Sequence, residues 1–224
     1  TFIIYLVIRY QVFGFITNEV EATELNHNPF MFSTAAERFA TIFYTWGKYL
    51  LLLLFPHPLT HDYYPWQIPI TGWNNIYVWI SLIIHLGIIT TALWGGIKKQ
   101  TWAFGLLFFY ITFSVTSNII IDLGLLLNER FMFVSSLGFI LTAYILLTKF
   151  IKSEKIILLI TGIILLGYSL KTLHRSAAWK DGRSLFYTDV NTSTNSNKCN
   201  VIAGFLLLDD AKAETDSITI KKHL

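Results

Sequence analysis

The sequence predicts an all-α membrane protein, in which a bundle of transmembrane helices is followed by a short polar tail of helical character. Apolar residues make up 54% of the 224 residues and charged residues only 14%, whereas a soluble domain carries about 25% charged residues. The apolar residues gather in runs long enough to cross a bilayer. The net charge of +3 is small and scattered, so we expect no nucleic-acid partner.

The apolar runs are separated by short segments that hold Lys, Glu-Arg or Gly-Gly, which mark the ends of the spans. We therefore expect helical apolar segments over residues 1–16, 75–96, 101–117, 131–148 and 156–170. The first run begins at Thr1 without a preceding polar stretch, so we expect it to be the end of a helix that starts upstream.

A further helix is predicted over residues 36–55. Ser33 or Thr34 is a suitable N-cap, and Pro56 is a suitable stop. Three charged residues fall within this helix, which is unusual for a plain span. We therefore expect an interfacial or re-entrant helix inside an extracytoplasmic loop that covers residues 17–74, with a spanning helix as the alternative.

The basic connections predict the orientation of the bundle. Loops 97–100 and 149–155 together hold five lysines, and lysine-rich connections stay in the cytoplasm. Loops 56–74 and 118–130 and the tail from residue 171 then face the other side. Because most polar and proline-rich elements lie on that side, we expect the functional site there. Composition favours a bacterial inner membrane, with the endoplasmic reticulum membrane as the alternative.

The chain divides into two predicted parts. Residues 1–172 form a transmembrane domain that is incomplete at its N-terminus, and residues 173–224 form an extracytoplasmic linker and the start of a helical repeat. The final apolar stretch, VIAGFLLLDDAKAETDS, has helical spacing but no partner helix within the chain. Helical repeats need neighbours to bury such faces, so we expect this segment to contact a following repeat.

Glu129 and Arg130 open a predicted span on the non-cytoplasmic side. A helix start explains part of this pattern, because Asn128 can cap the helix and Glu129 complements the helix dipole. The dipole does not favour Arg130, and arginine binds phosphate through paired hydrogen bonds. A lipid phosphate is therefore the predicted ligand, and a snorkelling arginine is the structural alternative.

A second group of candidate residues lies in the loop after residue 55. Its spacing is compatible with a metal, but no further ligand set is evident, so we favour a substrate-contacting or structural role and expect no metal. Arg38 lies on the same side if its helix is re-entrant, and Asp122 is expected to be solvated. The candidates in the loop are His57, His61, Asp62 and Tyr63.

Several motifs, taken in order, resemble the transmembrane and tetratricopeptide-repeat O-mannosyltransferases and their bacterial relatives. The family patterns NP, P-x-x-L-x-x-D-Y, SN…ERYLYLPSLGF and R-x-x-x-W-x-D-x-x-x-L-F have counterparts over most of the chain. Ser135 and Phe133 depart from the proline and tyrosine of the third pattern. The matching segments are NPF (28–30), ERFATIFYTWGKYLLLLLFPHPLTHDY (37–63), TSN (116–118), NERFMFVSSLGF (128–139) and HRSAAWKDGRSLF (174–186).

This resemblance implies part of a GT-C-like bundle followed by the start of tetratricopeptide-like repeats. It also implies transfer of a sugar, mannose in eukaryotic members, from a polyprenyl- or dolichyl-phosphate donor to Ser or Thr of a protein held by the repeats. No cofactor is expected besides this lipid-linked substrate. The catalytic acidic residue is expected upstream of Thr1, with Arg130 on the lipid phosphate, Glu129 orienting it and the 56–66 loop shaping the pocket.

Two other classes of protein are compatible with the composition. A non-catalytic membrane scaffold would use the spans as an anchor and the repeats as a protein-binding arm. A transporter would place polar residues opposite one another at mid-bilayer, often in duplicated halves, and the sequence shows neither pattern. The glycosyltransferase is the preferred prediction, and the scaffold is its alternative.

Overall fold

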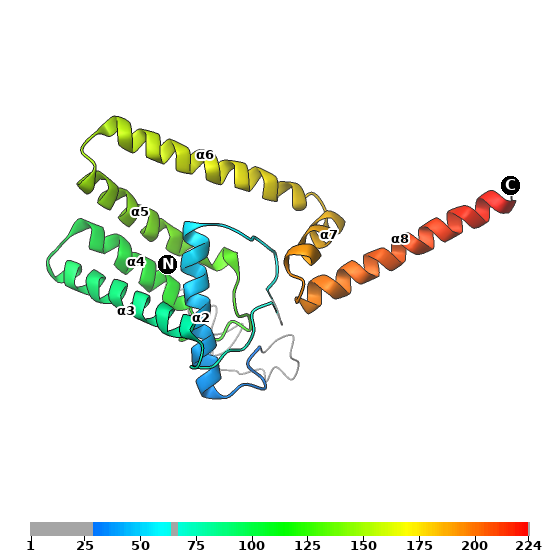
Figure 1. The fold of residues 1–224 in the computed structure, drawn as a ribbon, viewed down its shortest axis with the longest axis horizontal. Coiled ribbons are helices and arrows are strands. Elements are labelled where there is room, and N and C mark those ends of the chain that lie inside the picture. Colours follow the sequence, from blue (N-terminus) through cyan, green and yellow to red (C-terminus); the bar gives the residue numbers. More distant parts are fainter. Residues whose placement is uncertain (1–28, 64–66, 224) are drawn as a thin grey trace, which may run out of the picture.

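The computed structural model describes residues 29–63 and 67–223, and all its regular elements in that part are helices (Figure 1). The prediction of an all-α fold is thereby confirmed, while the predicted segment 1–16 lies outside the described residues. The elements are α2 (Ala35–Leu54), α3 (Ile76–Ile97), α4 (Thr101–Thr116), the 3-10 turn η2 (Glu129–Met132), α5 (Phe133–Phe150), α6 (Glu154–Ala178), α7 (Gly182–Thr192) and α8 (Asn197–His223).

Three stretches of helix are long and apolar enough to cross a membrane: α3, η2 with α5, and α6. Helix α4 is apolar but shorter. The four helices α3 to α6 run back and forth, so that the α3–α4 and α5–α6 connections lie at one end and α7 lies at the other (Figure 1). The protein is therefore a membrane protein with its lysine-rich connections at one end. That this end is cytoplasmic stays a prediction.

Helix α2 starts with the predicted cap. The Thr34 side chain accepts from the Glu37 backbone N–H, and the Glu37 carboxylate accepts from the Thr34 N–H at 2.8 Å. The helix ends at Leu54, just before Pro56. It runs across the ends of α3 and α4 instead of beside them, an arrangement expected of an interfacial helix (Figure 1).

Two aromatic side chains of α2 fasten it to the loop between α4 and η2. The Trp46 indole N–H donates to the Ser117 carbonyl at 3.1 Å, and the Tyr49 hydroxyl accepts from the Asn128 N–H at 2.9 Å. Both side chains belong to a buried cluster at this end of the bundle, where apolar contact adds to the hydrogen bonds. The cluster consists of Phe30, Ile42, Trp46, Tyr49, Ile68, Phe109, Phe113, Leu126, Leu127 and Met132.

Helices α4 and α5 cross at two glycines. A Cβ atom on Gly138 would meet the Gly105 carbonyl oxygen and would lie 2.7 Å from the Phe109 nitrogen. Small residues allow helix backbones to approach closely where lipid gives no hydrophobic drive for association. Thr142 donates across the same contact to the Trp102 carbonyl at 3.2 Å.

Helix α6 extends well beyond the predicted end of its span at residue 170, so the predicted boundary at 172 falls inside it. None of its most apolar 18-residue window is buried. The second half of α6 is attached to α2, because the Tyr168 hydroxyl donates to the carbonyls of Leu53 and Leu54 at 3.0 and 3.1 Å. Among the described residues, most of the apolar side chains of α6 are exposed, so they can contact lipid or other parts of the protein.

Helices α7 and α8 form a hairpin that extends from this end of the bundle (Figure 1). Asp181 caps α7 through the Ser184 N–H at 2.7 Å. Asp210 of α8 accepts from the Arg183 guanidinium and from the Tyr187 hydroxyl of α7. The hairpin is the kind of unit from which helical repeats are built, and the assignment to tetratricopeptide-like repeats stays a prediction.

We predict that Gly138→Ala destabilises the bundle, whereas Gly162→Ala on α6 does not. The added methyl group at 138 meets backbone atoms of α4 that cannot rotate away, which should cost about 1–3 kcal/mol. At 162 nothing lies within 4 Å of the new Cβ atom. Thermal unfolding of the detergent-solubilised protein measures both effects, and equal midpoints for the two variants would contradict the close crossing.

Candidate functional site

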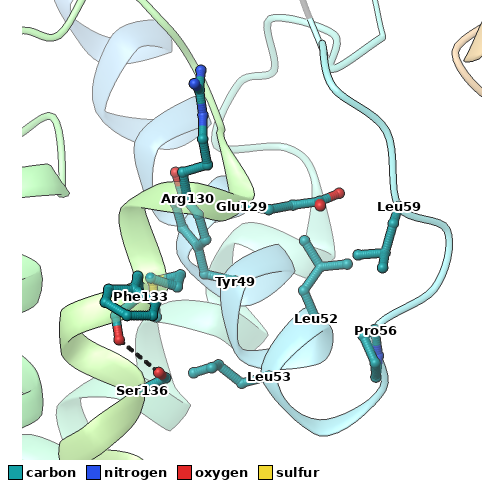
Figure 2. A pocket seen from close by; sticks show the side chains of 10 residues that line it. Tyr49, Leu52, Leu53, Pro56, Leu59, Glu129, Arg130, Phe133 and Ser136 are labelled. Carbon is teal, nitrogen blue, oxygen red and sulfur yellow. Dashed lines mark hydrogen bonds between the residues drawn. The ribbon is translucent and has the colours of Figure 1, made fainter. Parts of the chain in front are cut away.

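A cavity of about 640 Å³ lies where the end of α2, the loop after it and the start of α5 meet (Figure 2). Its lining is mostly apolar, and its two charged residues, Glu129 and Arg130, lie at one edge. A pocket of this kind suits a ligand with a charged group and an apolar body. The lining residues are Tyr49, Leu52, Leu53, Pro56, Leu59, Glu129, Arg130, Met132, Phe133 and Ser136.

The predicted cap at Asn128 is confirmed, on η2, and it also fixes the stem of Arg130. The Asn128 side-chain oxygen accepts from the backbone N–H of Arg130 at 3.1 Å and from its Nε at 3.2 Å. Within residues 29–63 and 67–223, no other group hydrogen-bonds the Arg130 side chain. The guanidinium is exposed and points away from Leu53 and Ser136, so its terminal nitrogens are free to bind an anion (Figure 2).

Glu129 points in another direction than Arg130, toward the loop that carries Leu59 (Figure 2). Its Oε1 atom accepts from the Thr60 backbone N–H at 2.9 Å and from the Tyr63 hydroxyl at 2.6 Å. Burial and then the charge of Glu129 raise the pKa of Tyr63 above its ordinary value, so the phenol stays protonated and donates. Glu129 therefore holds this loop against η2, and its role toward a phosphate stays a prediction.

The far side of the same loop contacts a buried ion pair. Asp189 of α7 is fully buried and accepts from the Arg175 guanidinium of α6 at 2.8 Å. It also accepts from the His61 backbone N–H, and its Oδ2 lies 2.7 Å from His61 Nδ1. Burial opposes ionisation of Asp189, yet the hydrogen bonds from Arg175 and His61 outweigh it and hold its pKa below the ordinary value.

The other candidates from the sequence are spread over three places. The Asp62 carboxylate accepts from the Ser196 hydroxyl at 2.8 Å, at the turn between α7 and α8. His57 Nδ1 lies 3.0 Å from the Lys171 ammonium of α6. Arg38 lies outside the cavity lining and pairs at 3.3 Å with Asp122, which is exposed to solvent as expected.

The structure thus brings Glu129, Arg130 and Tyr63 together and separates Arg38 from them. Among the residues it describes, no three His, Cys, Asp or Glu side chains lie close enough to hold a metal ion. Sequence reasoning missed Tyr49, which sits in an apolar run, and also missed Asp189. Asp189 is 128 positions from His61, and no local pattern connects the two residues.

The motifs and this geometry lead to the comparison with known proteins. The chain is distantly similar to a human protein O-mannosyltransferase. The relative, protein O-mannosyl-transferase TMTC4 of Homo sapiens, is 27% identical over 213 residues, which are 91% of this chain and 28% of that protein. The chain therefore spans little more than a quarter of its relative. No family model matches the chain, and no solved structure matches it.

We predict that Tyr63→Phe loosens the loop at the cavity more than Tyr187→Phe loosens the hairpin. Both substitutions remove a hydroxyl that donates to a carboxylate at 2.6 Å. Both bonds are partly buried, but the Asp210 carboxylate is 44% exposed and also pairs with Arg183, so water can replace the lost bond there. Glu129 is more enclosed, so loss of the Tyr63 bond should cost about 1–2 kcal/mol. Thermal unfolding and limited proteolysis of the 55–63 loop measure the effect. Identical behaviour of the two variants would show that the Glu129 contact does not hold the loop.

Proposed function

We propose that this chain is part of a membrane glycosyltransferase that moves a sugar from a polyprenyl-phosphate donor to a hydroxyl group of a protein. The observation that carries the proposal is the amphipathic cavity at the end of the bundle, with the exposed guanidinium of Arg130 at the edge of a mostly apolar lining. The distant similarity to a protein O-mannosyltransferase supports the same chemistry. Mannose is the proposed sugar, and Ser or Thr is the proposed acceptor.

Arg130 would bind the lipid phosphate and stabilise the charge that develops on it as the sugar leaves. Arginine suits this role because its planar fork matches phosphate oxygens and stays charged. The apolar part of the cavity, with Leu52, Leu53 and Phe133, would contact the first isoprene units of the donor. A direct inverting displacement needs no cofactor in such a site.

The acceptor hydroxyl needs a general base, but the Glu129 carboxylate in the cavity has a different role. Glu129 accepts two hydrogen bonds from the loop, which suits it to hold the pocket in shape. We propose that the base is an acidic residue elsewhere in the whole protein, as the family resemblance implies. The α7–α8 hairpin begins the arm that would present the acceptor protein, on the periplasmic or lumenal side of a bacterial inner membrane or of the endoplasmic reticulum.

We expect Arg130→Gln in the full-length protein to lower sugar transfer about a hundredfold, because a preorganised donor to the leaving phosphate is lost. Arg130→Lys should fall between this variant and wild type, since lysine keeps the charge but loses the planar fork. The measurement is transfer of radiolabelled sugar from a polyprenyl-phosphate donor to a Ser/Thr-rich acceptor peptide.

Arg183→Gln is the matched control, because it removes an arginine from α7, outside the cavity. Wild-type transfer by Arg130→Gln would end the phosphate assignment. Absence of transfer by the wild-type protein with every polyprenyl-phosphate sugar would favour the non-catalytic scaffold.

A further inference from the structure

We infer that Asp189 of α7 is a positioning residue for the cavity. The position of the α7–α8 hairpin would determine the position of the 55–63 loop, which lines the cavity. The inference rests on the proposed function only in what the cavity binds. It assigns a role to a residue outside the membrane bundle that does not line the cavity itself.

The 55–63 loop is held from both sides at the same residue, Thr60. On one side the Thr60 backbone N–H donates to Glu129 at 2.9 Å. On the other side the Thr60 hydroxyl donates to Asp189 at 3.3 Å and accepts from the Ser193 hydroxyl at 2.7 Å. A shift of α7 therefore displaces the residue whose backbone holds Glu129.

Asp189 forms a buried ion pair with Arg175. The side chain of Asp189 is fully buried, and the side chain of Arg175 is only 14% exposed. His61 lies beside them, with its ring edge on Phe186 at a centroid distance of 4.8 Å. Leaving a buried charge without its partners costs free energy, so the hairpin has one well-defined position between α6 and the loop.

Among the described residues, the other hydrogen bonds between the hairpin and the segment after α2 come from the end of α7 and the turn between α7 and α8. At the turn between α7 and α8, Ser193 donates to the Asp62 carbonyl at 3.0 Å and Ser196 donates to the Asp62 carboxylate. Gln67 donates to the Thr192 carbonyl at 3.3 Å. These bonds are neutral or partly exposed, whereas the buried Asp189 carboxylate holds both Thr60 and His61, so Asp189 is the residue whose loss should move the loop most.

The position of the α7–α8 hairpin would thereby affect the cavity in the membrane bundle. With the hairpin seated, Leu59 lines the cavity beside Glu129. With the hairpin displaced, the loop loses its outer support and Leu59, which is otherwise half-buried, becomes more accessible from water. An acceptor protein that binds the arm could use this connection, because binding free energy at one site changes the equilibrium at a linked site.

The test measures accessibility of Leu59→Cys to a membrane-impermeant maleimide, in full-length protein whose natural cysteines, including Cys199, are replaced by alanine. We expect Asp189→Asn to raise the labelling rate about tenfold, the effect of losing one charged hydrogen-bond set. Sugar transfer measured on the same variant should show a larger KM for the donor, since the pocket is less often formed.

Asp210→Asn is the matched control, because it weakens the contacts of the Asp210 carboxylate with Arg183 and Tyr187 inside the hairpin without touching the loop. Ser193→Ala is a milder second variant, in case Asp189→Asn does not fold, and it should raise labelling in the same direction. Unchanged labelling in Asp189→Asn and Ser193→Ala, or an equal rise in Asp210→Asn, would overturn the inference. If the labelling pattern is as expected and the wild-type protein transfers no sugar, the positioning role stands and the proposed function fails.

Discussion

The buried hydrogen bond from the Asn128 N–H to the Tyr49 hydroxyl determines where the polar edge of the cavity lies. It fixes the residue that caps η2, and the cap in turn holds the stem of Arg130 and the direction of Glu129. Tyr49 can act in this way because α2 lies across the bundle and carries its aromatic face onto the loop before η2. Tyr49 lies in a cluster of aromatic rings, with Phe113 at a centroid distance of 5.5 Å, so its hydroxyl has little freedom to move.

The crosswise position of α2 follows from its mixed character. Its first turn is polar, its middle face is aromatic and hydroxylated, and its end is apolar, so neither water nor lipid alone suits it. Packing on α3 resolves the conflict, because Ser81 donates to the Phe43 carbonyl at 2.5 Å and lies against Gly47, where a Cβ would come within 3.0 Å of it. The Leu53 and Leu54 carbonyls at the open end are then satisfied by Tyr168.

Local patterns were sufficient to predict the helices and part of the site. The Thr34 cap, the stop before Pro56 and the cap at Asn128 depend on neighbours within a few residues, and the structure has all three. The length of α6 was underestimated because its last turns are polar, yet Arg175 on those turns finds a partner in α7. The role of Asp189 could not be predicted, since it depends on two partners that are distant in sequence and close only after folding.

The same long-range contacts join what the sequence divides into a membrane part and a soluble part. A hairpin attached only by its linker would leave Arg175 and Asp189 to water, at little cost. In the structure the pair is enclosed by His61, Thr60 and Phe186, and removal of either partner would strand a buried charge. The polar part of the chain is therefore joined, through Asp189, to the loop that lines the cavity of the membrane part.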